Sequence, residues 1–136
     1  MRQALVNENA DLVAQSHRYV MRITGSDKEG QDQLGNFIDP EAPYPVIVTT
    51  SRLLSTGVDA QTCRLIVLDR AIGSMTEFKQ IVGRGTRVHE DTHKYYFTLM
   101  DFRGATSHFA DKEFDGEPVQ IYEPGDDDPV TPPDDI

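Results

Sequence analysis

A chain of 136 residues has the length of about one domain and can bury one hydrophobic core. Its single cysteine, Cys63, excludes an internal disulfide framework and a cysteine-based zinc site, and its apolar runs are too short to span a membrane. No secretory h-region opens the sequence, so the expected location is the cytoplasm.

The net charge of −10 is unevenly distributed along the chain. Residues 111–136 hold ten acidic residues and one basic one (net −9), which leaves twelve bases and thirteen acids in residues 1–110 (net −1). The acidity therefore does not exclude a nucleic-acid partner for the nearly neutral body. Residues 125–136 are rich in Asp and Pro and predict a linker or disordered tail, which leaves 111–124 as an extension of the domain.

Helical and extended patterns alternate in chain order. Residues 1–16 predict an amphipathic helix, 17–25 a short strand and 26–39 a weak helix. Apolar runs that are typical of buried strands follow at three places, residues 46–50, 65–69 and 95–100. Weaker patterns predict a helical turn and loop at 52–62, a helical turn at 104–111 and an edge strand at 117–124.

The best-defined helix begins at residue 74. Ser74 and Glu77 have the spacing of a capping box. Four apolar residues then lie on one helical face: Met75, Phe78, Ile81 and Val82. Gly83 and Gly85 loosen the end of this helix.

Short strands separated by helices predict an α/β fold with one mostly parallel sheet. Such sheets bind ligands at the carboxyl ends of their strands. The segments "TTSRLLSTGVD" and "DRAIGS" each follow a strand, and "QIVGRGTR" closes the next helix. We expect that all three could face one edge of the sheet.

The segment "HEDTH" fits the H-E-x-x-H pattern of zinc peptidases, with His89 and His93 as ligands and Glu90 as the base. That chemistry needs both histidines on a regular helix, whereas this segment lies between a glycine-containing helix end and a strong strand. Asp91 and Thr92 are also poor helix formers. We therefore expect a solvated turn and no metal site.

A second pattern imitates a metal-dependent nuclease through Asp69, Glu77 and Lys79. In a nuclease the second acid and the lysine alternate along a strand, so that both face one metal ion. Here Glu77 is already the capping partner of Ser74, and Lys79 lies on the same helix. A helix cap and a solvated or phosphate-facing lysine are the favoured interpretation.

The segment "QIVGRGTR" places Arg84 and Arg87 three residues apart at a helix end, where both guanidinium groups can reach the same side. Two close cations favour an anion between them, and arginine suits bidentate phosphate recognition. Gly83 and Gly85 permit close backbone approach. The alternative is a pair of surface arginines beside Glu90 and Asp91.

The segment "QIVGRGTR" resembles motif VI of superfamily 2 helicases and translocases, and "TTSRLLSTGVDA" resembles their motif V, in the same order and at a fitting distance. Residues 1–110 thus resemble part of a second RecA-like (helicase C-terminal) domain. "STGVDAQTCRLIVLDRAIGSMTEFKQIVGRGTR" with "YYFTLMDFRGAT" further resembles the restriction (R) subunit of type I restriction-modification enzymes, which pumps duplex DNA with ATP.

The resemblance implies a role for eight residues. Arg84 and Arg87 would act as arginine fingers on the γ-phosphate of ATP. Four residues would line the nucleotide cleft: Gln80, Gly83, Gly57 and Asp59. Thr50 and Ser51 would hold a DNA backbone phosphate, a contact that grips DNA without reading its sequence.

The sequence contains no G-x-x-x-x-G-K-[ST] loop and no Walker-type acidic motif. In the family both belong to the first RecA-like domain, which would also hold Mg²⁺. The chain is thus expected to be a fragment without ATPase activity of its own. The implied partners are duplex DNA, the first RecA-like and nuclease domains of the parent chain, and the methyltransferase and specificity subunits. The alternatives are a non-catalytic interaction module and, more remotely, a zinc peptidase.

Overall fold

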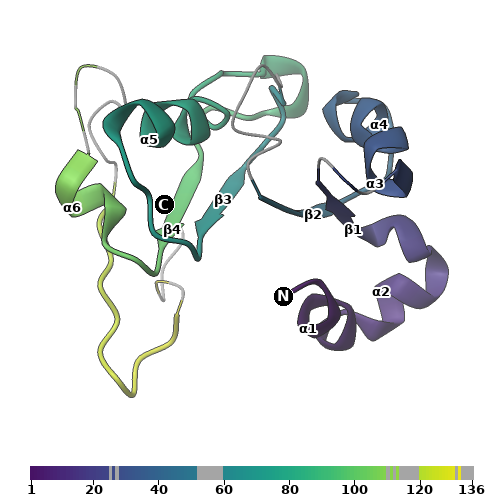
Figure 1. Cartoon of the computed structure of the whole chain (residues 1–136), viewed down its shortest axis with the longest axis horizontal. Helices are drawn as coiled ribbons and strands as arrows, with labels where there is room; N and C mark the ends of the chain where they lie inside the picture. The colour runs from purple at the N-terminus through teal and green to yellow at the C-terminus, as the bar shows by residue number, and fades with distance from the viewer. Residues whose placement is uncertain are drawn as a thin grey trace.

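The computed structural model describes residues 1–24, 26, 28–51, 60–109, 111, 113, 120–130 and 132. Short helices alternate with short strands, and both strand pairs are parallel (Figure 1). This arrangement confirms the predicted α/β class. None of the helices in these ranges is long and apolar enough to cross a membrane.

The N-terminal half carries a two-stranded parallel sheet and small helices. Its elements are α1 (Arg2–Glu8), α2 (Ala10–Gln15), η1 (His17–Tyr19), β1 (Val20–Ile23), α3 (Lys28–Asp32), α4 (Leu34–Ile38) and β2 (Ile47–Thr50). The single helix expected over residues 1–16 is broken at Asn9. Its side-chain amide donates to the Leu5 carbonyl at 2.8 Å, and such local bonding by Asn competes with helix propagation.

Strand β1 is the buried element of this half. Val20 and Ile23 are fully buried, and Val20 pairs with Ile47 of β2 in parallel register. Helix α3 lies close against the strand at Gly30, where a Cβ atom would stand 1.9 Å from the Arg22 carbonyl oxygen. The glycine is thus a packing requirement, because any side chain there would push the helix off the sheet.

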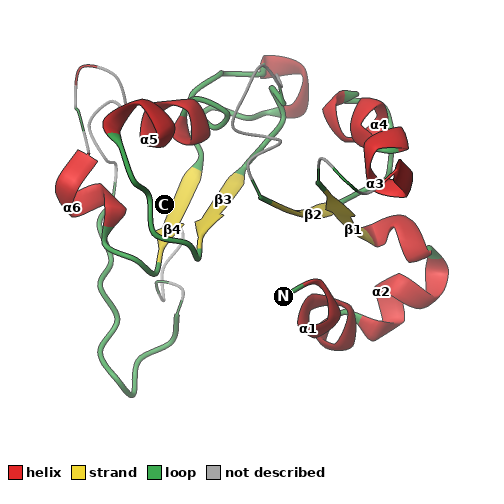
Figure 2. Ribbon diagram, viewed as in Figure 1, coloured by secondary structure: helices red, strands yellow, loops and turns green. Residues whose placement is uncertain are grey.

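The C-terminal half repeats the pattern with a second parallel pair. Its elements are β3 (Leu65–Leu68), α5 (Met75–Val82), η3 (Glu90–Thr92), β4 (Thr98–Asp101) and α6 (Ala105–Phe109). Helices α5 and α6 lie over the β3–β4 pair (Figure 2). Their contact is hydrophobic, with Phe78, Val82, Leu68 and Ala105 buried together.

The prediction of one sheet through residues 46–50, 65–69 and 95–100 is wrong. Within the described part of the chain, β2 pairs with β1 and β3 pairs with β4, in two separate sheets. Strands must lie about 4.8 Å apart to share hydrogen bonds. Here an open cavity of about 1410 Å³ is lined by residues of both β2 and β3. Each strand therefore keeps one edge without a neighbouring strand.

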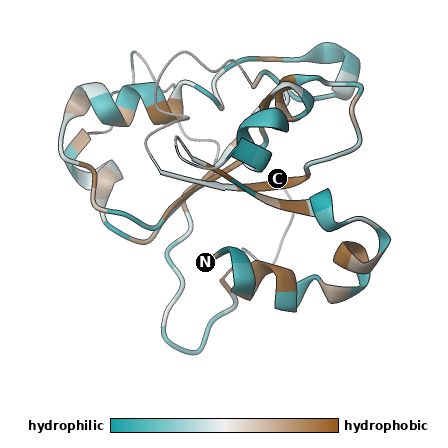
Figure 3. Cartoon of the chain, turned by 45° about the vertical axis from the view of Figure 1, so that its right-hand side comes forward, coloured by the Kyte–Doolittle hydropathy of each residue, from teal (hydrophilic) through white to brown (hydrophobic). Residues whose placement is uncertain are grey.

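Strand β3 is covered on one face only. Ile66 and Leu68 pack under α5 and α6, whereas Leu65 and Val67 point the other way and remain 50% and 45% exposed. Figure 3 shows the strands as hydrophobic segments at the centre of the molecule, between more polar helices. Parallel strands usually have both faces covered, so this apolar face is unusual.

The C-terminal segment differs from its predicted form. Gln120–Pro124, the described part of the expected edge strand, has no strand structure. Beyond it, Asp128 closes a turn on Gly125 through the Asp128 amide and the Gly125 carbonyl (3.1 Å), and the Tyr122 hydroxyl donates to the Pro129 carbonyl at 2.7 Å. The disordered tail predicted for residues 125–136 stays a prediction.

Candidate functional site

Helix α5 is fixed at its start by the predicted cap. The Ser74 hydroxyl accepts a hydrogen bond from the Glu77 amide at 3.1 Å. The Glu77 carboxylate accepts from the Gly73 amide at 3.1 Å and also pairs with Arg70. Glu77 is thus committed to the cap, and Lys79 forms an ion pair with Asp111 at 3.0 Å. These partners support the structural interpretation of this pattern over the nuclease one.

The chain leaves α5 through a tight turn that carries the arginine motif. Gly83 keeps right-handed helical angles, and Arg84 still bonds back to the Ile81 carbonyl at 3.2 Å. The Thr86 hydroxyl donates to the Gly83 carbonyl at 3.0 Å and holds the turn closed. A Cβ atom on Gly85 would lie 2.2 Å from the Phe97 ring. Gly85 therefore permits the close approach of the Phe97 ring, which lies just before β4.

Helix α5 ends at Val82, so neither arginine lies on the helix itself. Arg84 is half-buried and lines the cavity between β2 and β3, whereas Arg87 is exposed. Among the described residues, Gln80, Gly83 and Arg87 do not line this cavity. The helical spacing on which the shared-side expectation rested therefore does not apply, because the helix ends before both arginines.

The end of β2 supplies two further predicted residues. Thr50 and Ser51 are exposed and line the same cavity as Arg84. Thr50, Ser51 and Arg84, which come from the two candidate motifs, thus all line one large open cavity. Gly57 and Asp59 lie outside the described residues.

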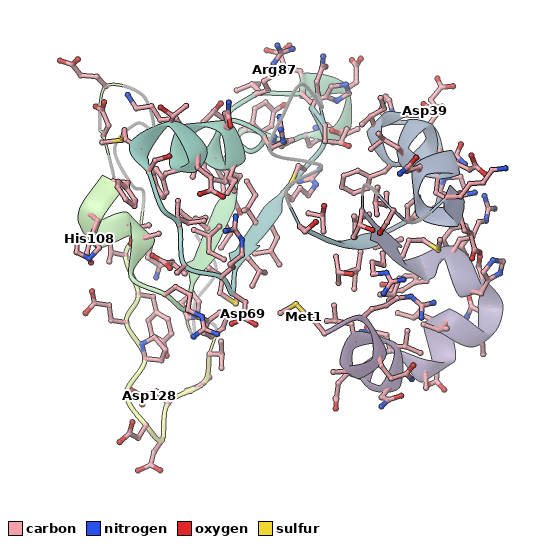
Figure 4. All side chains as sticks on the ribbon, in the orientation of Figure 1. Met1, Asp39, Asp69, Arg87, His108 and Asp128 are labelled. Carbon is pink, nitrogen blue, oxygen red and sulfur yellow. The ribbon has the colours of Figure 1, made fainter. Side chains whose placement is uncertain are left out.

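The expectation that all three loop segments face one sheet edge is also wrong. The crossover from β3 through α5 to the parallel strand β4 returns the chain to the edge where both strands start. Arg84 and Arg87 therefore lie at that starting edge, while Asp69 and the "DRAIGS" loop lie at the carboxyl ends. Figure 4 shows Arg87 and Asp69 at opposite ends of this half.

The cavity wall near Arg84 also holds Cys63. Burial raises the pKa of the Cys63 thiol above its ordinary value, although the nearby Lys94 and Arg84 cations act in the opposite direction. Lys94 is buried, and its ammonium group donates to the Gln61 carbonyl at 2.9 Å. No pattern around Lys94 pointed to burial, since a lysine before an aromatic strand ordinarily lies on the surface.

Asp101, at the end of β4, was another residue without a sequence signal. Burial raises the pKa of its carboxyl, but the hydrogen bonds that it accepts from the Thr106 and Arg103 amides and the Thr106 hydroxyl outweigh burial and leave the pKa below its usual value. The amide bonds measure 2.8 and 2.9 Å. Asp101 thereby ties the end of the strand to the first turn of α6.

The "HEDTH" segment forms a closed turn, as predicted, and not a zinc-binding α-helix. Glu90–Thr92 is a short 3-10 helix, and His93 takes a left-handed conformation with φ 55°. The His89 ring nitrogen Nδ1 lies 2.9 Å from the Thr92 hydroxyl. Among the described residues there is no cluster of three or more His, Cys, Asp or Glu side chains placed to hold a metal ion.

Comparison with known proteins gives two relatives. No family model matches the chain. The type I restriction enzyme EcoAI endonuclease subunit of Escherichia coli is 57% identical over 123 residues, which are 90% of this chain and 15% of the relative. A solved structure, a fragment assigned to the HsdR subunit of a type I restriction enzyme from Vibrio vulnificus YJ016, is 52% identical with a TM-score of 0.82, over 88% of this chain and 24% of that one.

The chain thus spans less than a quarter of the length of either relative. Identity above 50% over nearly the whole chain, together with the same arrangement of elements, indicates common ancestry and not only a shared fold. The homologues of this chain are segments of the R (HsdR) subunits of type I restriction enzymes.

Proposed function

We propose that the chain is part of an ATP-dependent DNA translocase motor, within the second RecA-like domain of the R subunit of a type I restriction enzyme. The observation that carries the proposal is that Arg84, from the motif VI-like turn, lines the same cavity as Thr50 and Ser51, from the motif V-like segment. The homology to R subunits supports it.

The residues around the cavity suit phosphate groups. Arg84 offers a planar fork of donors, and Thr50 and Ser51 offer hydroxyl groups. ATP would be the substrate, with Mg²⁺ held by the first RecA-like domain and not by this chain. Arg84 would neutralise charge on the γ-phosphate, and Thr50 and Ser51 would hold a DNA backbone phosphate.

The exposed position of Arg87 fits a finger that acts across a domain interface. A nucleotide held by the first RecA-like domain would be presented to Arg87 when the two domains close. Gln80, Gly83, Gly57 and Asp59 would line that cleft between the two domains, although Gln80 and Gly83 do not line the cavity that holds Arg84. The partners of the complete enzyme would be duplex DNA, a nuclease domain in the same polypeptide, and the methyltransferase and specificity subunits.

The test uses the full-length R subunit with Arg84→Ala and Arg87→Ala. An arginine finger is worth roughly 10³–10⁵ in rate. DNA-stimulated ATP turnover should therefore fall severely in both variants, with DNA affinity nearly unchanged. Arg→Lys at either position should not restore turnover, because lysine lacks the planar fork. Ser51→Ala should show the opposite bias and weaken the grip on DNA more than nucleotide binding.

Arg103→Ala is a matched control, because Arg103 is a surface arginine whose guanidinium pairs with Asp69 at 3.2 Å. Loss of an exposed ion pair costs at most about 1 kcal/mol of stability and should leave turnover normal. If Arg84→Ala and Arg87→Ala behave like this control, the motor assignment of the motif is wrong.

The alternative, a non-catalytic interaction module, is favoured by one observation, the exposed apolar face of β3 at Leu65 and Val67. The Arg84 and Arg87 variants discriminate between the two functions. If this segment is a non-catalytic interaction module, both variants of the full-length R subunit should keep normal ATP turnover. In either case we expect the isolated chain not to hydrolyse ATP, because its sequence lacks a P-loop to cradle the β-phosphate.

A further inference from the structure

Lys94 is the one charged side chain that is buried among the described residues, with 1% of its surface exposed. Its ammonium nitrogen donates to the backbone carbonyl of Gln61 at 2.9 Å. The two residues are separated by 33 positions in the chain, so this bond ties the segment after the arginine motif to the segment after the motif V-like residues.

A second hydrogen bond joins the same two segments, and here the segment at 61–64 supplies the donor. The Arg64 guanidinium donates to the Thr92 carbonyl. The carbonyl of Arg64 in turn accepts from the Thr98 amide at 2.8 Å, at the start of the β3–β4 pairing. Residues 61–64 are thus held at both ends by the turn that contains residues 89–94.

That turn is built to hold a fixed shape. His89 and Lys94 form an antiparallel bridge with both backbone hydrogen bonds, at 2.9 and 3.0 Å. The His93 amide bonds to the Glu90 carbonyl at 2.9 Å, and the His89 ring contacts the Thr92 hydroxyl. A closed turn of this kind gives Lys94 a defined starting point from which its side chain reaches inward.

Burying an ammonium group is costly, and an apolar residue of similar length would commonly stabilise a core position more. A buried lysine is therefore better explained by what it positions. Its bond partner, Gln61, follows Ala60, which is itself buried, and the Ala60 carbonyl accepts from the Cys63 amide at 3.1 Å. Lys94 thus fixes the carbonyl inside a tight turn of the chain.

We propose that Lys94 is a positioning residue that couples the two motifs. It locks residues 60–64, at and just after the end of the motif V-like sequence, to the turn at 89–94, so that these residues and the segment carrying Arg84 and Arg87 move as one body during each ATP cycle. The inference rests on the proposed function, because it concerns the same motor. We call these two hydrogen bonds, Lys94 to Gln61 and Arg64 to Thr92, the clamp. The "HEDTHK" segment then has a role as the closed turn from which the clamp is made.

The test compares Lys94→Met with Lys79→Met in the full-length R subunit, assembled with its partner subunits on DNA. Both substitutions remove an ammonium group, and Lys79 pairs with Asp111 away from residues 60–64. We expect Lys94→Met to lower the kcat of DNA-stimulated ATP hydrolysis at least tenfold with less than a twofold change in KM for ATP. The base pairs translocated per ATP should also fall. Lys79→Met should leave all three unchanged.

Two further variants keep the outcome decisive. Arg64→Met removes the second bond from an exposed residue, so it tests the clamp even if Lys94→Met fails to fold. Lys94→Arg retains a cationic donor and should recover part of the coupling. Normal kcat and normal base pairs per ATP in Lys94→Met, or in Arg64→Met where Lys94→Met does not fold, would overturn the inference. If Arg84→Ala and Arg87→Ala still abolish turnover, the proposed function survives that result.

Discussion

Arg84 and Arg87 are three residues apart in one short motif, yet their surroundings differ. The backbone hydrogen bonds of the turn after Val82 direct Arg84 into the cavity and leave Arg87 exposed. The three-residue spacing places both arginines on one side only if the helix continues past Val82, and it ends there. At the scale of single residues, the neighbours that decide a role come from distant segments, as Phe97 does for Gly85.

Gly85→Ala should destabilise the chain. The new Cβ atom would start 2.2 Å from the Phe97 ring, so the ring or the turn must shift. Overpacking of this kind costs about 1–3 kcal/mol. The measurement is the midpoint of urea unfolding. Gly35→Ala is the control with opposite sign, because no atom lies within 4 Å of the new Cβ and alanine favours helix α4 by up to about 1 kcal/mol.

Asp101 should make the stability of the chain depend on acid pH. The pKa of its carboxyl is lowered in the folded chain, so the unfolded chain binds the proton more tightly. The stabilisation is then present above the unfolded pKa of about 3.9 and is lost as pH falls through the folded value.

Asp101→Asn should therefore be less stable than wild type at pH 6, by roughly 1 kcal/mol, and the difference should shrink below about pH 4. Urea unfolding at several pH values measures it. Asp126→Asn, in the exposed tail, controls for the lost charge. A stability difference that stays constant down to pH 2 would contradict this account of Asp101.

At the scale of elements, the sequence patterns predicted correctly those helices and strands that depend on interactions between near neighbours in the chain. The N-cap of α5 at Ser74 follows from the capping pattern, and the strands β2 and β3 follow from their β-branched runs. Strand β4 begins at Thr98, three residues later than predicted, and Tyr95 and Tyr96 before it are exposed. The break at Asn9 depends on one side-chain bond that competes with the helix, which periodicity alone does not reveal.

Ser74→Ala should weaken α5 and with it the core under the helix. The substitution removes the acceptor for the Glu77 amide, a loss worth about 1 kcal/mol. A domain of this size should then melt roughly 4 °C lower. Circular dichroism of the isolated chain on heating measures the shift. Thr76→Ala, an exposed change in the same turn, should leave the melting temperature nearly unchanged.

At the scale of the whole molecule, the unexpected feature is the division into two small sheets. Each sheet is an α/β unit of the predicted kind, and the relation between them could not be read from the sequence. Pairing joins residues far apart in the chain, and an apolar run fits a strand with one neighbour as well as a strand with two. The resemblance to helicase motifs named candidate residues that stay a prediction, while the cavity that Thr50, Ser51 and Arg84 line could be seen only in the structure.

The open edge and bare face of β3 should make the isolated chain self-associate. Exposed apolar strands with a free edge favour pairing between molecules. Light scattering over a range of concentrations should show species larger than one chain. Val67→Lys should shift the population toward the monomer, because a charge on an edge strand opposes such pairing.

Val88→Lys is the control, since Val88 is similarly exposed but lies outside the strands. It should leave the association unchanged. A wild-type chain that stays monomeric at every concentration would show that the β3 surface does not drive association.

Cys63 offers a natural labelling site in the wall of the cavity. It is the single cysteine of the sequence and lies beside Arg84 in the cavity wall. With a raised pKa the thiol stays protonated at neutral pH, so an electrophilic dye attaches slowly and faster in mild alkali. A fluorophore placed there would report on the space between the two sheets without any engineered residue, and its emission would register whatever closes over that space.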